Sequence, residues 1–411
     1  MNTASLRILW VKVGGLWPLN TGGRLRTFHT VAELSQRHQV TVVTTHAPGD
    51  DSKALAAQLP ACERVISLEH APTKVGSAAF ALATTRSWLS PLPLDVWRWR
   101  IPAVRQEVER LLSSGDFDLC VADFLVAVPN VPLGGRVPVV LFEHNVEHMI
   151  WKRLAQAPGP RWRRALLEVE WRKMRRYEAA ACTAASLTLA VSEADRTLLA
   201  AAAPAARVAA VETGVDTDYF APDRTHEKPG TIVFTGSLDW YPNEDAVVHF
   251  VDAILPRVRG EAPDARFVVV GRNPTAKLRQ AAEAAGATVT GTVDDVRPFL
   301  AEATVCVVPL RIGGGTRLKI FEALAMAKPV VSTSIGAEGL PVVSGKHIVL
   351  ADGAGDFARA VVTLLADPAR RHRLANAGRA LVEERFSWGR VAIDFETRCR
   401  AAVEERSHAH A

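Results

Sequence analysis

Short apolar runs alternate with longer segments of mixed polarity along almost the whole 411-residue chain. Most of these runs are rich in Val and Ile and roughly four to eight residues long, which predicts buried strands. They occupy residues 6–13, 40–44, 65–68, 117–123, 137–142, 187–191, 231–235, 266–270, 287–290 and 305–308. Helical patterns lie between them, at 24–37, 151–178, 243–259, 296–303 and 317–327. Strands that alternate with helices predict an α/β fold with parallel sheets.

The alternation is interrupted between Ala200 and Pro229, where the chain becomes rich in Ala and Pro and then loop-like. A chain of this length has room for two ordinary domains, each with its own core. We therefore predict two Rossmann-like domains, residues 1–205 and 206–385, followed by a terminal helix and tail at 386–411.

The stretch from Val305 to Gly339 combines a strand, a glycine loop and a helix start. Gly313, Gly314 and Gly315 are followed by Thr316, a good N-cap residue. Free backbone N–H groups and the positive end of the helix dipole favour an anion at such a place. The stretch therefore predicts a phosphate site.

Three charged residues in the helix after this loop refine the prediction. Arg317 and Lys319 lie in its first turn, where a cation is disfavoured unless something anionic lies in front of it. Glu322 interrupts an apolar run one turn later, and its carboxylate suits a ribose diol. The alternative is an ordinary surface helix in which Lys319 and Glu322 form an ion pair.

Composition excludes several classes of protein. A net charge of +5 is modest for this length and does not call for nucleic acid. Five scattered cysteines without a CxxC pair indicate reduced thiols in a cytoplasm. The run at 6–13 contains Arg7 and Lys12 and predicts a strand, not a signal peptide. No apolar stretch approaches the roughly 20 residues of a spanning helix, so membrane contact would be peripheral.

An ordered set of segments resembles the nucleotide-sugar glycosyltransferases of family 4, which have the GT-B fold. The segments are PLNTGGRLRTFHTVAEL (18–34), ETGVDTDYFAP (212–222), TGSLDWYPNEDAV (235–247), VVVGRNP (268–274), TGTVDDVRPFL (290–300), the stretch at 305–339 with its GGGTRLKIFEALA motif, and FSW (386–388). This resemblance implies a GT-B architecture, in which two domains face each other across a cleft and the C-terminal helix crosses back to the first domain.

The resemblance also implies an activity. The second domain would bind a nucleotide-diphosphate sugar, the first would bind a glycan, lipid-linked or small-molecule acceptor, and transfer would retain anomeric configuration without a metal or other cofactor. The residues assigned to the donor in this way are Gly22, Gly23, Gly236, Gly271, Arg272, Gly314, Gly315, Thr316, Arg317, Lys319 and Glu322. Arg317 and Lys319 would hold the diphosphate and Glu322 the ribose.

Two departures from the family pattern concern the donor. Most relatives have a Glu eight residues before the ribose Glu, where this chain has Gly314. Many also have an Arg and a Lys on the first donor-domain loop, where Ser237 and Asn243 stand here. We expect Arg317 and Lys319 to supply the missing phosphate charge.

A cluster of polar residues follows the strand at 137–142, where strand ends point into the binding crevice of α/β sheets. His144 and His148 spell the HxxEH metal motif with Glu147, but His144 comes about two residues after a strand, so the helix that this motif needs is not expected. By resemblance, His144 is the active-site histidine; the alternative is a buried histidine without a chemical role. Asp123 and Glu143 are candidates on the acceptor side.

The predicted helix at 151–178 has nine basic and three acidic residues, a net charge of +6, with Trp and Leu interleaved. Either it rests on an anionic membrane or it is a solvated helix whose apolar stripe packs on the first domain. Two functions compete with sugar transfer: a GT-B-fold epimerase acting on a nucleotide sugar, which would use cleft carboxylates such as Glu143 or Glu147, and a non-catalytic sugar-nucleotide sensor.

Overall fold

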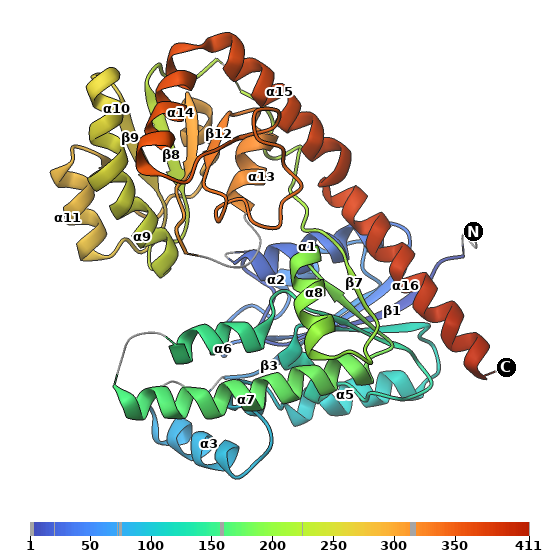
Figure 1. Ribbon diagram of the computed structural model, residues 1–411. Helices are drawn as coiled ribbons and strands as arrows, with labels where there is room; N and C mark the ends of the chain where they lie inside the picture. The colour runs from blue at the N-terminus through green and yellow to red at the C-terminus, as the bar shows by residue number, and fades with distance from the viewer. Residues whose placement is uncertain are drawn as a thin grey trace. The chain divides into compact units, whose positions relative to one another are not determined.

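The computed structural model describes residues 4–19, 21–71, 73, 76–156, 160–223, 225–312 and 318–410. The chain forms two compact units: unit 1 comprises Met1–Glu212 and Val391–Ala411, and unit 2 comprises Thr213–Arg390 (Figure 1). The divisions at 212/213 and 390/391 fall a few residues after those expected from the sequence, at 205/206 and 385/386.

Unit 1 is built on a seven-stranded sheet in the order β3-β2-β1-β4-β5-β6-β7, in which every neighbouring pair is parallel. The strands are β1 (Arg7–Lys12), β2 (Gln39–His46), β3 (Arg64–Glu69), β4 (Leu119–Asp123), β5 (Val139–Phe142), β6 (Leu187–Ala190) and β7 (Val208–Ala210). The inner positions of β1, β2, β4, β5 and β6 are buried and mostly apolar, whereas the edge strands β3 and β7 are partly exposed. Strands shielded on both faces do not need the alternation of half-exposed strands, which explains the continuous apolar runs.

The helices of unit 1 connect consecutive parallel strands. They are α1 (Gly22–Ser35), α2 (Ala54–Gln58), α3 (Ala78–Trp88), α4 (Leu94–Arg98), α5 (Pro102–Ser113), a 3₁₀ turn η1 (Leu125–Asn130), α6 (Glu147–Gln156), α7 (Arg161–Ala184) and α8 (Glu193–Ala202). The last helix, α16 (Trp388–His410), also packs here, because the Phe395 ring lies 5.4 Å from Trp10 and 5.1 Å from Phe142, between ring centroids.

Unit 2 has a six-stranded parallel sheet in the order β10-β9-β8-β11-β12-β13. Its strands are β8 (Thr231–Thr235), β9 (Arg266–Val270), β10 (Thr288–Val289), β11 (Val305–Val308), β12 (Val330–Ser332) and β13 (Val349–Leu350). Its helices are α9 (Tyr241–His249), a π-helical turn (Phe250–Ile254), α10 (Leu255–Glu261), α11 (Ala276–Ala284), α12 (Arg297–Glu302), α13 (Leu318–Ala325), α14 (Ala354–Ala366) and α15 (Pro368–Arg385). The predicted α/β fold with two parallel sheets is confirmed.

Three predicted elements differ from the structure. The single helix expected at 151–178 is two helices, α6 and α7, with Pro160 at the N-cap of the second. The helix expected at 243–259 contains the π-helical turn at Phe250–Ile254. The region read as a loop after Ala200 contains β7. Among the described residues, no helix is long and apolar enough to cross a membrane.

Candidate active site

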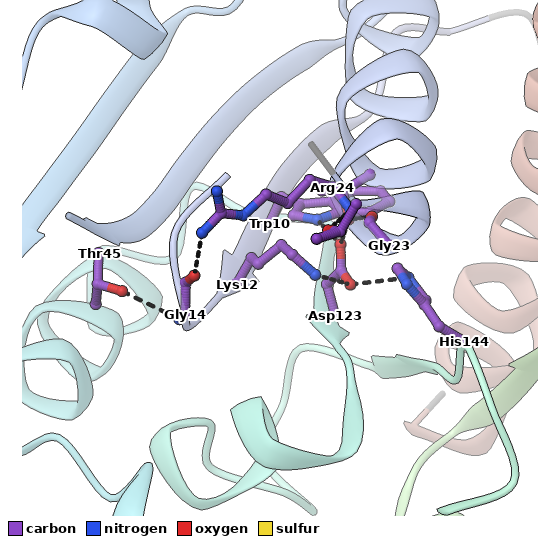
Figure 2. A network of polar contacts seen from close by, with 10 residues as sticks. Trp10, Lys12, Gly14, Gly23, Arg24, Thr45, Asp123 and His144 are labelled. Carbon is purple, nitrogen blue, oxygen red and sulfur yellow. Dashed lines mark hydrogen bonds and ion pairs between the residues drawn. The ribbon is translucent and has the colours of Figure 1, made fainter. Parts of the chain in front are cut away.

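In unit 1, Asp123 is the last residue of β4 and lies at the carboxyl edge of the sheet, where open α/β folds bind ligands. Its carboxylate is fully buried and accepts hydrogen bonds from Trp10 Nε1 at 2.8 Å and Thr27 Oγ1 at 2.6 Å. Lys12 Nζ lies 3.1 Å from Oδ1 and donates to it. Figure 2 shows Trp10 and Lys12 beside the Asp123 carboxylate. A buried charge needs such partners, so Asp123 is held as a carboxylate.

His144 shares the same carboxylate from the loop after β5. Its Nε2 atom lies 3.0 Å from Asp123 Oδ1, although the two groups are not aligned as in a hydrogen bond (Figure 2). The rings of Phe124 and Phe142 contact the imidazole edge-on, at centroid distances of 5.1 and 4.7 Å. Aromatic rings on both sides fix the orientation of the imidazole.

The protonation states of this pair follow from burial and charge. Burial lowers the pKa of His144 to about 4, although Asp123 opposes the shift. Burial alone would raise the pKa of Asp123, but Lys12, His144 and Thr27 together hold it well below its usual value. The pair is therefore a carboxylate beside a neutral imidazole at neutral pH. A carboxylate next to Nε2 favours the tautomer with the proton on Nε2, which leaves Nδ1 as an acceptor.

The free edge of His144 faces the start of α1. Nδ1 is buried and has no hydrogen-bond partner in the described part of the chain. A Cβ on Gly23 would lie 3.2 Å from it, which is tighter than ordinary contact. Gly22 and Gly23 are the first residues of α1, and Thr21 caps the helix by accepting from Arg24 N. The structure therefore brings together Gly23 and His144, which the sequence analysis had assigned to the site separately.

Arg24 holds the loop between β1 and α1 in place. Its guanidinium donates to the carbonyl oxygens of Pro18 and Gly14, both at 3.1 Å, while Gly14 N donates to Thr45 Oγ1 at 3.1 Å (Figure 2). Gly14 has a φ of 88°, a conformation that only glycine adopts without strain. Hydrogen bonds from Arg24 and to Thr45 therefore hold the loop that precedes Gly22 and Gly23.

Glu143 and His148 belong to a buried acid cluster with Glu147 of α6 and Glu178 of α7. Burial, Glu178 and Glu147 raise the pKa of Glu143 well above its usual value, so the surroundings favour the protonated form of this carboxyl. Glu178 accepts from the backbone N–H of Glu147 at 2.7 Å and is paired with His148 Nδ1. Because α6 begins at Glu147, His144 precedes the helix, as expected for a chance HxxEH spelling.

In unit 2, two glycines bring the ends of β8 and β9 together. A Cβ on Gly271 would lie 1.7 Å from the Gly236 carbonyl oxygen, so only glycine fits there. Arg272 Nε, directly after it, donates to Ser237 Oγ at 2.9 Å, and Leu238 N donates to the Arg272 carbonyl at 2.9 Å. The predicted donor residues Gly236, Gly271 and Arg272 therefore form one corner at the carboxyl edge of this sheet.

Lys319 reaches the same corner from α13. Its Nζ donates to Asn243 Oδ1 at 2.8 Å and lies 4.0 Å from the centroid of the Phe234 ring. A Cβ on Gly236 would come within 2.7 Å of Nζ. Lys319 and Arg272 thus bring two positive charges to Ser237 and Asn243, where the sequence pattern lacked them; Asn243 lies in the first turn of α9 and not on the loop expected from the sequence.

Glu322 lies one turn further along α13 and is partly buried. Burial raises its pKa to about 7, against the opposing charge of Lys319. The other predicted members of this site, Gly314, Gly315, Thr316 and Arg317, lie outside the described residues.

Several residues of these sites were not predicted. Lys12, Trp10 and Thr27 bind Asp123, and Asn243 binds Lys319, but none of them was assigned a role from the sequence. Lys12 could have been recognised from the sequence, because a lysine at the end of an apolar, buried strand needs a partner for its charge. Within the described ranges, no group of three or more His, Cys, Asp or Glu side chains could hold a metal ion; metal independence stays a prediction.

Comparison with known proteins identifies both units. Residues 21–219 match the family Glycosyltransferase Family 4, and residues 229–367 match Glycosyl transferases group 1. The chain belongs to these glycosyltransferases. The family 4 domain contains Asp123 and His144, and the group 1 domain contains Lys319 and Glu322.

Among curated proteins, the chain is 31% identical over 215 residues to the GDP-mannose-dependent alpha-(1-6)-phosphatidylinositol monomannoside mannosyltransferase of Mycobacterium tuberculosis. The match covers 46% of this chain and 54% of that protein. It is also 28% identical over 199 residues to the M. tuberculosis glycogen synthase, covering 46% of this chain and 47% of that protein. The chain thus spans about half the length of the curated relatives it matches.

Solved structures agree on the fold. The sucrose-phosphate synthase of Thermosynechococcus elongatus superposes with a TM-score of 0.70 at 18% identity, covering 96% of this chain and 98% of that one. WaaG, a glycosyltransferase involved in lipopolysaccharide biosynthesis, superposes with a TM-score of 0.61 at 15% identity, covering 94% and 99%. Anabaena HepE in complex with UDP and glucose superposes with a TM-score of 0.64 at 15% identity, covering 96% of this chain and 99% of that one. The predicted GT-B fold is confirmed, while the crossing of the C-terminal helix back to the first domain stays a prediction.

Proposed function

We propose that this protein transfers a hexose-type sugar from a nucleotide-diphosphate sugar to a hydroxyl of a glycan, a lipid-linked carrier or a small-molecule acceptor. The bond from the anomeric carbon to the diphosphate oxygen breaks, and a bond from that carbon to the acceptor oxygen forms. The acceptor hydroxyl loses its proton to the released nucleoside diphosphate. The observation that carries the proposal is the corner around Lys319, because it gathers two fixed cations at a sheet edge suited to a nucleotide, with Glu322 one turn further along α13.

The diphosphate end of the donor fits the Lys319 corner. Lys319 Nζ is held by Asn243 and Phe234, and Arg272 is held by Ser237, so neither cation needs to be reoriented before it acts. Preorganised cations stabilise the charge that develops on a leaving diphosphate, which commonly accounts for a large share of catalysis. With Lys319 and Arg272 in this place, a metal ion is not needed for charge compensation, and we propose metal-independent transfer.

The neutral imidazole of His144 fits a positioning role in the family 4 domain. Its Nδ1 is a buried acceptor without a partner in the described residues, and such an atom favours a hydroxyl of a bound sugar. Retention of configuration and a cytoplasmic location are part of the same proposal, supported by the family resemblance and by the reduced cysteines.

An assay of nucleoside diphosphate release tests the proposal. Nucleotide sugars are first screened by thermal shift, because a bound donor stabilises the folded protein by mass action. With the best donor, we expect release to be stimulated by an acceptor and to persist after exhaustive chelation. Lys319→Met should lower this turnover about 100-fold or more, while Lys346→Met, which removes an exposed lysine of the same unit, should not change it.

Other outcomes point to the competing functions. Conversion of the donor into an isomeric nucleotide sugar without an acceptor would establish the epimerase. Donor binding without any turnover would establish the non-catalytic sensor. Full turnover in Lys319→Met would remove the diphosphate assignment, and loss of turnover after chelation that zinc restores would remove metal independence.

A further inference from the structure

Helix α7 has one buried face and, beside it, an exposed apolar stripe. The buried face contains Met174 and Ala181. The stripe contains Trp162, Leu166 and Val169, whose spacings of four and three residues place them on one side of the helix. Their side chains are 67%, 38% and 51% exposed. An exposed apolar stripe of this kind indicates a surface that binds an external partner.

The C-terminal end of α3 is held against α7 by a hydrogen bond. Lys173, four residues after Val169 and on the same side of α7, donates to the Ser87 carbonyl oxygen at 2.7 Å. The two residues after Ser87, Trp88 and Leu89, are 51% and 88% exposed. Figure 1 shows α3 lying beside α7. Trp88 and Leu89 are therefore exposed next to the contact that joins α3 to α7, on the side of α7 that carries Val169.

Positive charge surrounds the stripe. Arg161, Arg163 and Arg164 flank Trp162 in the first turn of α7, and Arg86 precedes Trp88 by two residues on α3; all four are exposed. Within the described ranges, no ion pair involves these four guanidinium groups, whereas Arg172 further along α7 is paired with Glu168. The charge at the start of α7 is thus left uncompensated beside exposed tryptophans.

Exposed apolar side chains beside uncompensated arginines indicate which kind of partner this surface binds. A second protein chain would have to match the stripe in shape and also supply acids to the arginines. A lipid bilayer with anionic headgroups supplies both requirements at once, because Trp and Leu enter the headgroup region while Arg contacts the phosphates. We propose that the surface formed by Trp88, Leu89, Trp162, Leu166 and Val169, with the arginines around it, binds the face of an anionic lipid membrane.

The membrane surface does not depend on the proposed function, since none of its residues belongs to the Asp123 or the Lys319 site. Membrane binding and sugar transfer are therefore measured separately, and either proposal can fail alone. The proposal assigns the whole protein to the membrane surface as a peripheral protein, with α7 lying along the bilayer plane.

Sedimentation of the full chain with lipid vesicles tests the inference. Vesicles contain phosphatidylcholine alone or with about 30 mol% phosphatidylglycerol. The salt concentration is about 0.1 M, at which the charged lipid surface still attracts basic residues close to it. We expect strong binding to the anionic vesicles only. Because each basic residue near the surface contributes roughly fivefold to binding, the triple variant Arg161→Glu/Arg163→Glu/Arg164→Glu should bind at least ~100-fold more weakly. Trp162→Ser/Leu166→Ser should lower binding about tenfold or more.

Matched controls and a second measurement complete the test. Arg257→Glu/Arg279→Glu/Arg373→Glu removes the same charge from exposed positions of unit 2 and should bind no more than a few-fold less. Brominated acyl chains should quench tryptophan fluorescence, less so in Trp88→Phe/Trp162→Phe. The proposal is overturned if the wild-type protein stays in solution with anionic vesicles, if both triple variants bind alike, or if quenching is unchanged without Trp88 and Trp162.

Discussion

Asp123 Oδ1 lies 3.0 Å from His144 Nε2, and both side chains are shielded from solvent. A carboxylate that faces one imidazole nitrogen determines which nitrogen is free to accept a hydrogen bond. Here the free nitrogen is Nδ1, beside Gly23. The arrangement therefore makes the chemistry of His144 depend on a residue that need not touch the substrate.

Replacement of His144 tests the role of this imidazole. We expect His144→Ala to lower turnover by about 100-fold, because a positioned polar contact is lost, while the protein still folds. His144→Gln, whose side-chain amide oxygen can accept a hydrogen bond, should retain part of the activity. Steady-state kinetics and thermal unfolding measure both effects, with His226→Ala, at an exposed histidine of unit 2, as the control. Unchanged turnover in His144→Ala would mean that the buried histidine is only structural.

The same site predicts a pH profile. Since the pKa of His144 is about 4 and that of Asp123 is lowered further, the pair does not change charge above about pH 5. Activity that depends on the Nδ1 acceptor should be lost only as the pH falls through about 4, when the imidazole becomes a double donor. A dependence near pH 6.5 that disappears in His144→Gln would contradict the neutral imidazole.

The pairing of Lys12 with Asp123 predicts a strong coupling in stability. Asp123→Asn leaves the buried ammonium of Lys12 without its carboxylate and should cost about 3–5 kcal/mol in the free energy of unfolding. Lys12→Met should cost less, about 1–3 kcal/mol, because Asp123 keeps Trp10 and Thr27 as donors. The double variant should be more stable than the sum predicts, by more than about 1 kcal/mol. Urea unfolding of the four proteins measures this cycle, and strict additivity would show that the two charges do not interact.

The fold could be predicted from the sequence further than the sites could. Thr231–Thr235, Arg266–Val270 and Val305–Val308 are strands with the predicted bounds, because buried parallel strands are uninterrupted apolar runs. The short strand Val208–Ala210 was not predicted, because three partly exposed residues are too few to form an apolar run. Helix boundaries were predicted less accurately than strand boundaries. One helix was predicted across Pro160, where the structure has two.

The sites were predictable where a residue contradicted its local context. Lys319 at a helix start and Glu322 in an apolar run were such contradictions, and both lie at the sheet edge of unit 2. Asn243 is an ordinary helix residue, and only the folded chain shows that its amide oxygen holds Lys319. The link between Lys12 and Asp123 joins residues that are 111 positions apart, which no local pattern encodes.

Glu322 predicts a pH dependence of donor binding. In the ligand-free protein, burial raises its pKa to about 7, but accepting two hydrogen bonds from a ribose diol requires the carboxylate. Affinity for a nucleotide sugar should therefore rise with pH, by up to about tenfold per unit below pH 7, and level off above about pH 8. Calorimetric titration across this range measures it. Glu322→Gln should bind more weakly with no such slope, and an unchanged slope in this variant would assign the titration to another group.

The acid cluster around Glu143 predicts a different pH effect, on stability. Because burial and the nearby carboxyls of Glu178 and Glu147 raise its pKa in the folded state, the folded protein binds this proton more tightly than the unfolded chain does. Its contribution to stability is complete below the ordinary pKa of about 4.5 and is lost as the pH rises through the folded-state value.

Glu143→Gln keeps the shape of the protonated side chain and removes its titration. We expect the wild-type protein to lose stability as the pH rises above about 5, by up to about 1.4 kcal/mol per pH unit from this group, and the variant to lose less. The variant should therefore be more stable than the wild type at pH 8, as measured by melting temperature across the range. Glu63→Gln, at an exposed position of the same unit, controls for the loss of a carboxylate. A variant whose stability falls as steeply as that of the wild type would show that Glu143 is already ionised in the folded protein.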